Sequence, residues 1–313
     1  MGVRYFEVRF GPQLLAVPGK LTIPQICHAV LAGLERATKE QNAAPEIQAG
    51  DEPEYAYGII LCAMRFFDEH YSPYYAALFE VHAAEDPHKV YGLASMALAT
   101  EAVKLRNAGL PIVAIDIAGA ENGNPAADHA KAFRYAHKHL IQKTVHAGEA
   151  YGAASIYEAI VDCYSQRIGH GFNIFDASKV EHLEDPVKRQ EYVDRLSQYV
   201  ANNRICLEVC LTSNLQTIPE MHGDVRKHPI TKMLDAKMAV TLNTDNCTVS
   251  HTDMVKELDL AATKLELTAQ QLKEIIIKGF EKSFMPLPYG KKKAYIDQIV
   301  AYYDRIWEQA QLD

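Results

Sequence analysis

The chain has 313 residues, a formal net charge of −8 and 48% hydrophobic residues, which is the make-up of an ordinary folded protein. Its acidic balance argues against broad contact with nucleic acid, because phosphate binding requires clustered Lys and Arg. No segment is apolar for the ~20 residues that a membrane span needs, and residues 1–10 lack the pattern of a secretory signal. We therefore expect a cytoplasmic protein with neither nucleic-acid nor membrane partners.

The six cysteines are scattered along the chain, which favours free thiols in a reducing compartment. Cys206 and Cys210 are spaced C-x3-C, but no second pair lies near them. A zinc site of the four-cysteine type needs two such pairs. We therefore expect both thiols to be packed in an apolar strand.

Short β-branched runs alternate with longer helical patterns along the chain. Strands are predicted at residues 5–10, 57–64, 112–117, 144–146, 167–170, 205–209 and 239–243. Helices are predicted at 22–39, 129–142, 155–163 and 291–309, and residues 41–54 are predicted to form a loop. Residues 66–110 are mostly helical, with a break at 85–87, and are a candidate insertion that forms a lid or a contact surface.

One more helix is indicated by its N-terminus, where Thr268 and Gln271 form a capping box. The apolar residues of that helix are expected to be buried: Leu272, Ile275, Ile276 and Phe280.

This alternation predicts an α/β fold with a parallel sheet, either doubly wound or closed into a barrel. No G-x-G-x-x-G follows an early strand, which weakens a dinucleotide-binding fold. Polar residues follow several different strands, as in the active site of a (β/α)8 TIM barrel. We therefore predict a single barrel domain over residues 1–313. Seven strands are predicted where closure needs eight, so one strand is missing or was not recognised.

Four polar side chains stand at or just after strand ends: His146, Glu149, His170 and Asp245. Each alone has a simpler explanation, because a histidine beside glycine can be a packed core residue and an aspartate after a strand is a common helix N-cap. In a barrel the strand ends converge on one mouth. Two imidazoles and two carboxylates there suit a divalent metal with an acid or base beside it.

Glycines accompany these groups at positions 119, 148, 169 and 171. Because glycine has no side chain, we expect these positions to allow close approach of a flat substrate or of the backbone.

The chain resembles the adenosine deaminases in the order and spacing of its motifs. The matching runs are residues 144–149 (TVHAGE), 167–171 (RIGHG) and 242–245 (LNTD), supported by 3–10, 116–119, 210–214, His228-Pro229 and 282–284. The resemblance extends over nearly the whole chain and is weak at 41–54 and 66–110. The pattern differs from the cytidine deaminase type of zinc site, which has H-x-E and P-C-x-x-C.

The resemblance implies a barrel with one zinc ion, of the metal-dependent amidohydrolase type. It implies that His146 and Asp245 are zinc ligands, that Glu149 donates a proton to purine N1 and that His170 orients and deprotonates the attacking water. The Gly119 backbone would contact the purine. The implied reaction is hydrolytic deamination of adenosine, and of deoxyadenosine, to inosine and ammonia in purine salvage.

The sequence departs from the family in two places. Asn246 stands where many members carry a second aspartate that contacts the purine, which leaves the base preference open. The family's first strand carries an H-x-H pair of zinc ligands, whereas residues 1–5 match the second strand. The only H-x-H here is residues 137–139, in a predicted helix whose exposed face they would occupy.

Three explanations of the missing strand are open: a trimmed chain, a strand supplied by a second chain or segment, or a short paralogue. Three functions correspond to the sequence. They are adenosine deamination, deamination of adenine or another 6-aminopurine, and a catalytically inactive module that still binds purines.

Overall fold

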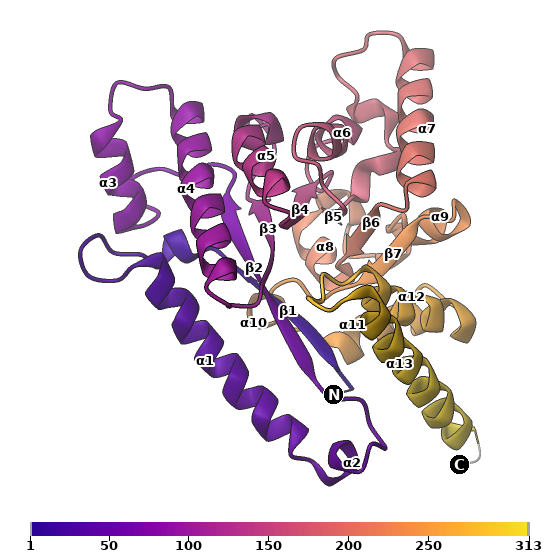
Figure 1. Cartoon of the computed structure of the whole chain (residues 1–313). Coiled ribbons are helices and arrows are strands. Elements are labelled where there is room, and N and C mark those ends of the chain that lie inside the picture. Colours follow the sequence, from indigo (N-terminus) through magenta and orange to yellow (C-terminus); the bar gives the residue numbers. More distant parts are fainter. Residues whose placement is uncertain (1, 312–313) are drawn as a thin grey trace.

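The computed structural model describes residues 2–311, and its centre is one parallel sheet (Figure 1). The sheet has seven strands, and its spatial order is the order of the strands in the chain. The strands are β1 (Tyr5–Phe10), β2 (Ala56–Met64), β3 (Ile112–Ala118), β4 (Gln142–Ala147), β5 (Arg167–His170), β6 (Cys206–Val209) and β7 (Ala239–Leu242). All six neighbouring pairs are parallel, which confirms the predicted α/β class.

The sheet is an open barrel. Within residues 2–311, β1 pairs with β2 and β7 pairs with β6, and no pairing joins β1 to β7. The arrangement is a TIM-like fold with one strand fewer than the eight of a closed (β/α)8 barrel. The prediction of such a barrel short of one strand is therefore confirmed. Each open edge presents backbone groups that another strand could pair with.

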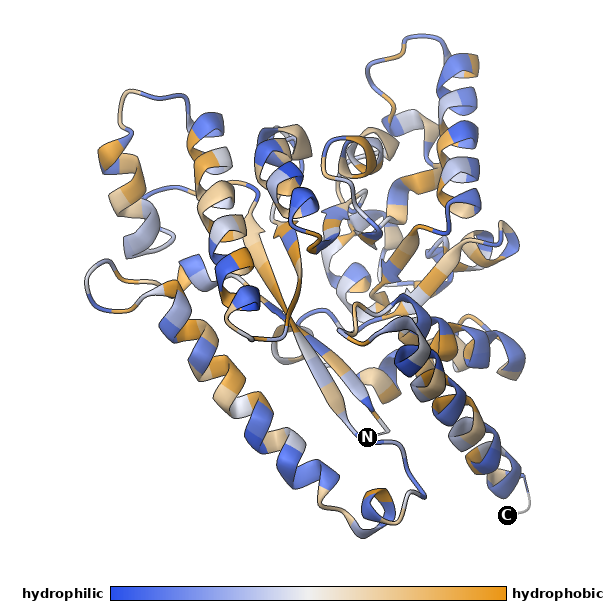
Figure 2. Ribbon diagram, viewed as in Figure 1, coloured by the Kyte–Doolittle hydropathy of each residue, from blue (hydrophilic) through white to orange (hydrophobic). Residues whose placement is uncertain are grey.

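Helices lie between successive strands along the chain, and the last four of the described helices follow β7 (Figure 1). They are α1 (Ile23–Asn42), α2 (Pro45–Gln48), α3 (Pro73–Val81), α4 (Pro87–Asn107), α5 (Ala130–Lys138), α6 (Ala153–Val161), α7 (Pro186–Asn202), α8 (Leu211–Thr217), α9 (Ile230–Asp235), α10 (Cys247–Ser250), α11 (Met254–Thr263), α12 (Ala269–Lys282) and α13 (Tyr289–Ala310). Figure 2 shows hydrophilic and hydrophobic residues alternating along α1 and α13, as expected for helices with one face toward solvent.

Several predicted boundaries shift. The segment 41–54 is not all loop, because α1 continues to Asn42 and α2 follows it. Helix α5 ends at Lys138, four residues before the predicted end, because β4 already begins at Gln142. The segment 66–110 divides into α3 and α4, and the Asp86 side chain caps α4 at the predicted break.

The capping box of α12 is present as predicted, with Thr268 and Gln271 each bonded to the other's backbone N–H. The burial of that helix was overestimated: Ile275 is buried, whereas Leu272, Ile276 and Phe280 are only half-buried.

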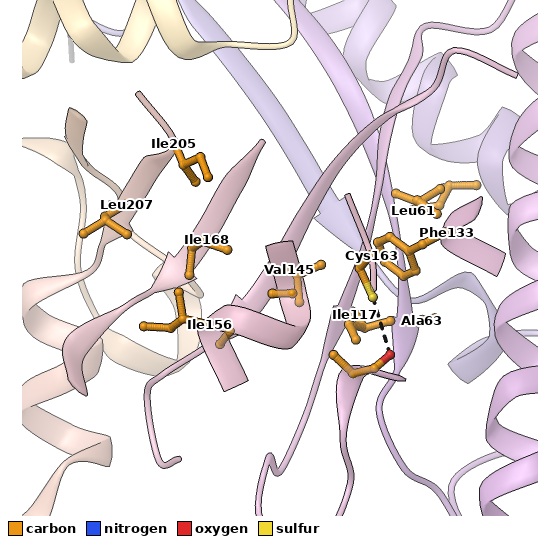
Figure 3. Packing of buried hydrophobic residues seen from close by; sticks show 14 of the residues in the cluster. Leu61, Ala63, Ile117, Phe133, Val145, Ile156, Cys163, Ile168, Ile205 and Leu207 are labelled. Atoms are coloured by element: carbon orange, nitrogen blue, oxygen red, sulfur yellow. Dashed lines mark hydrogen bonds between the residues drawn. The ribbon is translucent and has the colours of Figure 1, made fainter. Parts of the chain in front are cut away.

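The main core lies between the strands and the surrounding helices. Figure 3 shows Val145 and Ile168 of the sheet close to Ile156 of α6, and Cys163 bonded to a carbonyl in the loop before α5. These side chains are fully buried. A continuous apolar layer of this kind fixes the strand ends from outside.

The inner side of the sheet holds a network of charges instead of a purely apolar filling. Glu208 of β6 lies 2.7 Å from Arg9 of β1 and 2.5 Å from Arg167 of β5. Arg167 also pairs with Glu7 at 2.7 Å, and Arg9 with Asp116 of β3 at 3.3 Å. Burial opposes the charge on Glu208, but the two guanidinium groups outweigh it and hold the pKa of that carboxyl at about 2.

Two smaller expectations concern the cysteines and the H-x-H run. Cys206 and Cys210 are buried free thiols as predicted, but only Cys206 lies in a strand, because β6 ends at Val209 and Cys210 is the residue before α8. His137 and His139 are exposed at the end of α5, which confirms that this pair lies on a solvated face. No helix within residues 2–311 has the length and apolar character needed to cross a membrane.

Candidate active site

His146 stands near the end of β4, with its ring oriented by a buried carboxylate. Its Nδ1 lies 2.8 Å from an oxygen of Asp116, a fully buried residue of β3. Burial alone lowers the pKa of His146, but the Asp116 carboxylate outweighs it and raises that pKa. Histidines that bind metals are commonly held in this way, with a carboxylate at one ring nitrogen and the other nitrogen left for the ion.

His170 ends β5 beside His146, and their ring centroids are 5.3 Å apart. Its Nε2 lies 3.6 Å from a carboxylate oxygen of Glu149, which follows β4. Burial is the largest influence on the pKa of His170 and lowers it, whereas the carboxylates of Glu149 and Asp245 act in the opposite direction. His170 adopts φ = 65°, a left-handed conformation that is costly for a residue with a side chain and is typical of functional positions.

A polar network from α8 holds this pair. The Asn214 amide lies 3.1 Å from Nδ1 of His170 and 3.4 Å from a carboxylate oxygen of Glu149. Its own oxygen lies 3.2 Å from the buried His228. The hydroxyl of Thr217 donates to Glu149 at 2.7 Å. The acid and the imidazole are therefore fixed relative to each other by one helix.

Asp245 and Asn246 follow β7 at the open edge, and both are exposed. Asp245 has φ = 53° and accepts a hydrogen bond from Ser213 at 2.8 Å. The Asn246 side-chain oxygen accepts from the backbone N–H of Val249 at 3.0 Å and so caps α10. Ser213 thus holds Asp245 near the mouth of the barrel, whereas the side-chain oxygen of Asn246 is already used to cap α10.

The described residues do not complete a metal site. Within residues 2–311, no group of three or more His, Cys, Asp and Glu side chains is placed to hold an ion. Zinc sites use at least three protein ligands. The orientation of His146 suits a ligand, and Asp245 is a second candidate, so the donor set available here is incomplete.

The glycines beside the site divide into two kinds. A Cβ on Gly148 would lie 2.6 Å from Ile156, one on Gly171 would lie 2.9 Å from Leu207, and one on Gly169 would lie 3.1 Å from His146. At Gly148 and Gly171 a side chain would displace a neighbour and strain a positive φ, and at Gly169 it would press on His146, so these glycines serve packing within the protein. Gly119 is exposed at φ = 116° with no atom closer than 3.6 Å to such a Cβ, which leaves its backbone open to a ligand.

Sequence reasoning gave no role to several residues of the site. Asn214 and His228 belong to runs that matched the family, but only the fold shows that they meet beside His170. Asp116 belongs to another run that matched the family, and only the fold shows that its carboxylate lies beside His146. Glu121 lies in a loop, and its sequence neighbourhood carries no signal of its contacts.

Comparison with known proteins agrees with this geometry. The family model described as "Adenosine deaminase" matches residues 87–302. An adenosine deaminase of Mycobacterium avium is 32% identical over 302 residues, which are 95% of this chain and 70% of that protein.

The chain belongs to the adenosine deaminase family. A further relative in it, adenosine deaminase 1 of Streptomyces coelicolor, is 31% identical over 96% of this chain and 64% of its own length. The chain thus spans roughly two thirds of the length of these family members.

Solved structures of similar fold include an amidohydrolase of Burkholderia ambifaria with bound Zn. Its TM-score is 0.74 and its identity 18%, over 99% of this chain and 71% of that one. The adenine deaminase of Arthrobacter aurescens has a TM-score of 0.68 and 18% identity, over 97% of this chain and 75% of that one. At this identity the likeness establishes the fold, which is the amidohydrolase type of TIM-like barrel.

Proposed function

We propose that this member of the adenosine deaminase family catalyses hydrolytic deamination of adenosine and deoxyadenosine to inosine or deoxyinosine and ammonia. The observation that carries the proposal is the Glu149–His170 pair beside His146 at the carboxyl ends of β4 and β5. In a barrel this is the end where catalytic groups gather. Six free thiols, five of them buried, support a place in a reducing cytoplasm.

In this proposal Glu149 is the proton donor. The purine ring lies over the exposed Gly119 backbone, with N1 toward the Glu149 carboxyl. Proton transfer to N1 stabilises the charge that develops as water adds to C6, so Glu149 enters the reaction protonated. Thr217 and Asn214 contact one oxygen of Glu149, which leaves the other oxygen for the proton.

His170 is proposed to orient the attacking water. The Asn214 NH₂ donates to Nδ1 of His170, so the neutral ring carries its hydrogen at Nε2, the nitrogen on the side of Glu149, and donates it toward the water oxygen. Asp245 accepts a hydrogen bond from the same water, and its carboxylate is the proposed acceptor of the proton that the water loses.

We also propose that zinc takes part, with His146 and Asp245 among its ligands. A bound zinc ion lowers the pKa of water toward neutrality. The two candidate ligands are too few for a zinc site. We propose that a strand from a further segment or from a second chain pairs between β1 and β7 and supplies the remaining donors.

A second candidate is deamination of adenine or another 6-aminopurine. It is supported by Asn246, whose side-chain oxygen caps α10 and leaves only the amide nitrogen for a purine. The third candidate is a purine-binding module without catalysis, which the incomplete donor set supports.

The deciding experiment measures ammonia release by the purified 313-residue protein from adenosine, deoxyadenosine and adenine, with and without added zinc. We expect zinc-dependent turnover of the nucleosides and loss of at least about 100-fold in Glu149→Gln, since general acid catalysis contributes 10²–10⁴-fold. The matched control is Glu191→Gln on the outer helix α7, which should keep full activity.

The other outcomes separate the candidates. Faster turnover of adenine than of adenosine would show that the substrate is the free base and not the nucleoside. Folded protein that binds a purine nucleoside without turnover, at saturating zinc, would assign this chain to the third candidate.

A further inference from the structure

We propose that Glu121 is a positioning residue that fixes the Glu149 segment in the reaction proposed above, on which this inference rests. Glu121 is buried, with 6% of its surface exposed, and lies in the loop after β3. One carboxylate oxygen accepts the Gly148 N–H at 2.7 Å. The other accepts the N–H groups of Glu149 at 2.8 Å and of Ala150 at 3.1 Å.

Three successive amides converging on one carboxylate are not part of a helix cap. They follow β4 directly, and α6 begins only at Ala153. Within this loop the left-handed turn at Gly148, with φ = 72°, aims the amides toward Glu121. An ionised carboxylate supplies acceptors only, and hydrogen bonds to it are stronger than those between neutral groups.

The other side of the Glu149 residue is held as well. Its carbonyl accepts a hydrogen bond from the Asn173 amide at 2.7 Å. With Glu121 at the N–H and Asn173 at the carbonyl, the Glu149 backbone is tied to the loop after β3 and to the short 3-10 helix after β5. Rotation of this backbone would move the carboxyl away from His170, which lies 3.6 Å from it.

Glu121 also joins the two sides of the expected purine site. It stands two residues after Gly119, whose exposed backbone is the expected purine contact. We call the three hydrogen bonds from residues 148–150 to the Glu121 carboxylate the clamp. The clamp sets the distance between the Gly119 segment, which would contact the purine, and the segment that carries the proton donor Glu149. A misplacement of 1 Å can cost about 100-fold in rate.

The test begins with a measurement that does not depend on catalysis. In Glu121→Gln one acceptor oxygen becomes an NH₂ donor facing backbone N–H groups, so at least one amide loses its partner. We expect hydrogen exchange at residues 148–150 to become at least about 10-fold faster, as for loss of a charged hydrogen bond. Exchange elsewhere should stay unchanged, which shows that the variant is folded.

The matched control is Glu158→Gln. Glu158 of α6 also accepts a backbone N–H from a neighbouring loop, that of Ala126 at 3.0 Å, but it lies outside the proposed site. The Glu158→Gln variant should show the same amide hydrogen exchange at residues 148–150 as the parent protein. Unchanged exchange at these amides in Glu121→Gln would overturn the clamp, whether or not the protein deaminates adenosine.

Kinetics then test whether the clamp acts through Glu149. We expect kcat for adenosine to fall about 100-fold in Glu121→Gln, with a smaller change in KM. The same substitution should have little further effect in the Glu149→Gln background. Equal losses in both backgrounds would overturn the positioning role. Should Glu121→Gln fail to fold, Glu121→Asp keeps the charge, shortens the side chain, and is expected to loosen the same three amides.

Discussion

The buried carboxylate of Glu208 is expected to be a major source of stability above pH 4.5. It lies between Arg9 and Arg167 and also accepts the Thr144 hydroxyl at 3.2 Å. Its pKa falls from an ordinary 4.5 to about 2 despite burial. At about 1.4 kcal/mol for each pKa unit, this fall corresponds to about 3 kcal/mol of stabilisation.

We therefore predict that Glu208→Gln lowers the free energy of unfolding by about 3 kcal/mol at pH 7, in the range for breaking a buried ion pair. The sign of the pH dependence follows from a lowered pKa in the folded state. The stabilisation is fully present above about pH 4.5 and is lost as the pH falls toward about 2. The variant should lack this part of the acid dependence.

The assay is urea unfolding of both proteins between pH 7 and pH 3, followed by circular dichroism. The control is Glu220→Gln, which removes an exposed ion pair with Lys179 and should cost less than about 1 kcal/mol. A Glu208→Gln protein within 0.5 kcal/mol (about the uncertainty of such a measurement) of the parent at pH 7 would refute this account of the inner charge network.

Three further predictions concern the site and the core. Gly148→Ala should lower the free energy of unfolding by about 1–3 kcal/mol, because Gly148 has φ of 72° and packs against α6. The control Gly33→Ala, on the exposed side of α1, should raise that free energy by up to about 1 kcal/mol. Both are measured by urea unfolding, and equal effects would contradict the close packing at Gly148. Asn214→Leu removes an amide that contacts Glu149, and kcat/KM for adenosine should fall by about 10-fold or more. An unchanged kcat/KM in this variant would contradict the role of Asn214. Titration of the native protein with a thiol reagent should modify Cys247 rapidly and the five buried cysteines only after unfolding; two or more fast thiols would contradict the fold.

The local sequence determined the elements of the fold well. Strand β1 lies where an aromatic and β-branched run predicted it, β3 does so to within one residue, and the Thr268–Gln271 capping box marks the start of α12. These features depend on neighbours within a few residues, so a single sequence carries them. Helix α5 ends earlier than predicted because β4 already begins at Gln142. The position of β4 depends on its pairing with other strands of the sheet, which the local sequence pattern does not show.

The sequence also determined which residues deserve attention at the strand ends, and the resemblance of its motifs identified the family. What only the tertiary structure decided is which groups meet. Asn214 reaches His170 across 44 residues, and Glu121 reaches the amides after β4 across 27 to 29 residues. The open edge between β1 and β7, with Asp245 exposed beside it, is equally a property of the whole sheet. Such contacts arise because parallel strands bring distant segments to one edge, and the period of the side chains along a strand does not encode that proximity.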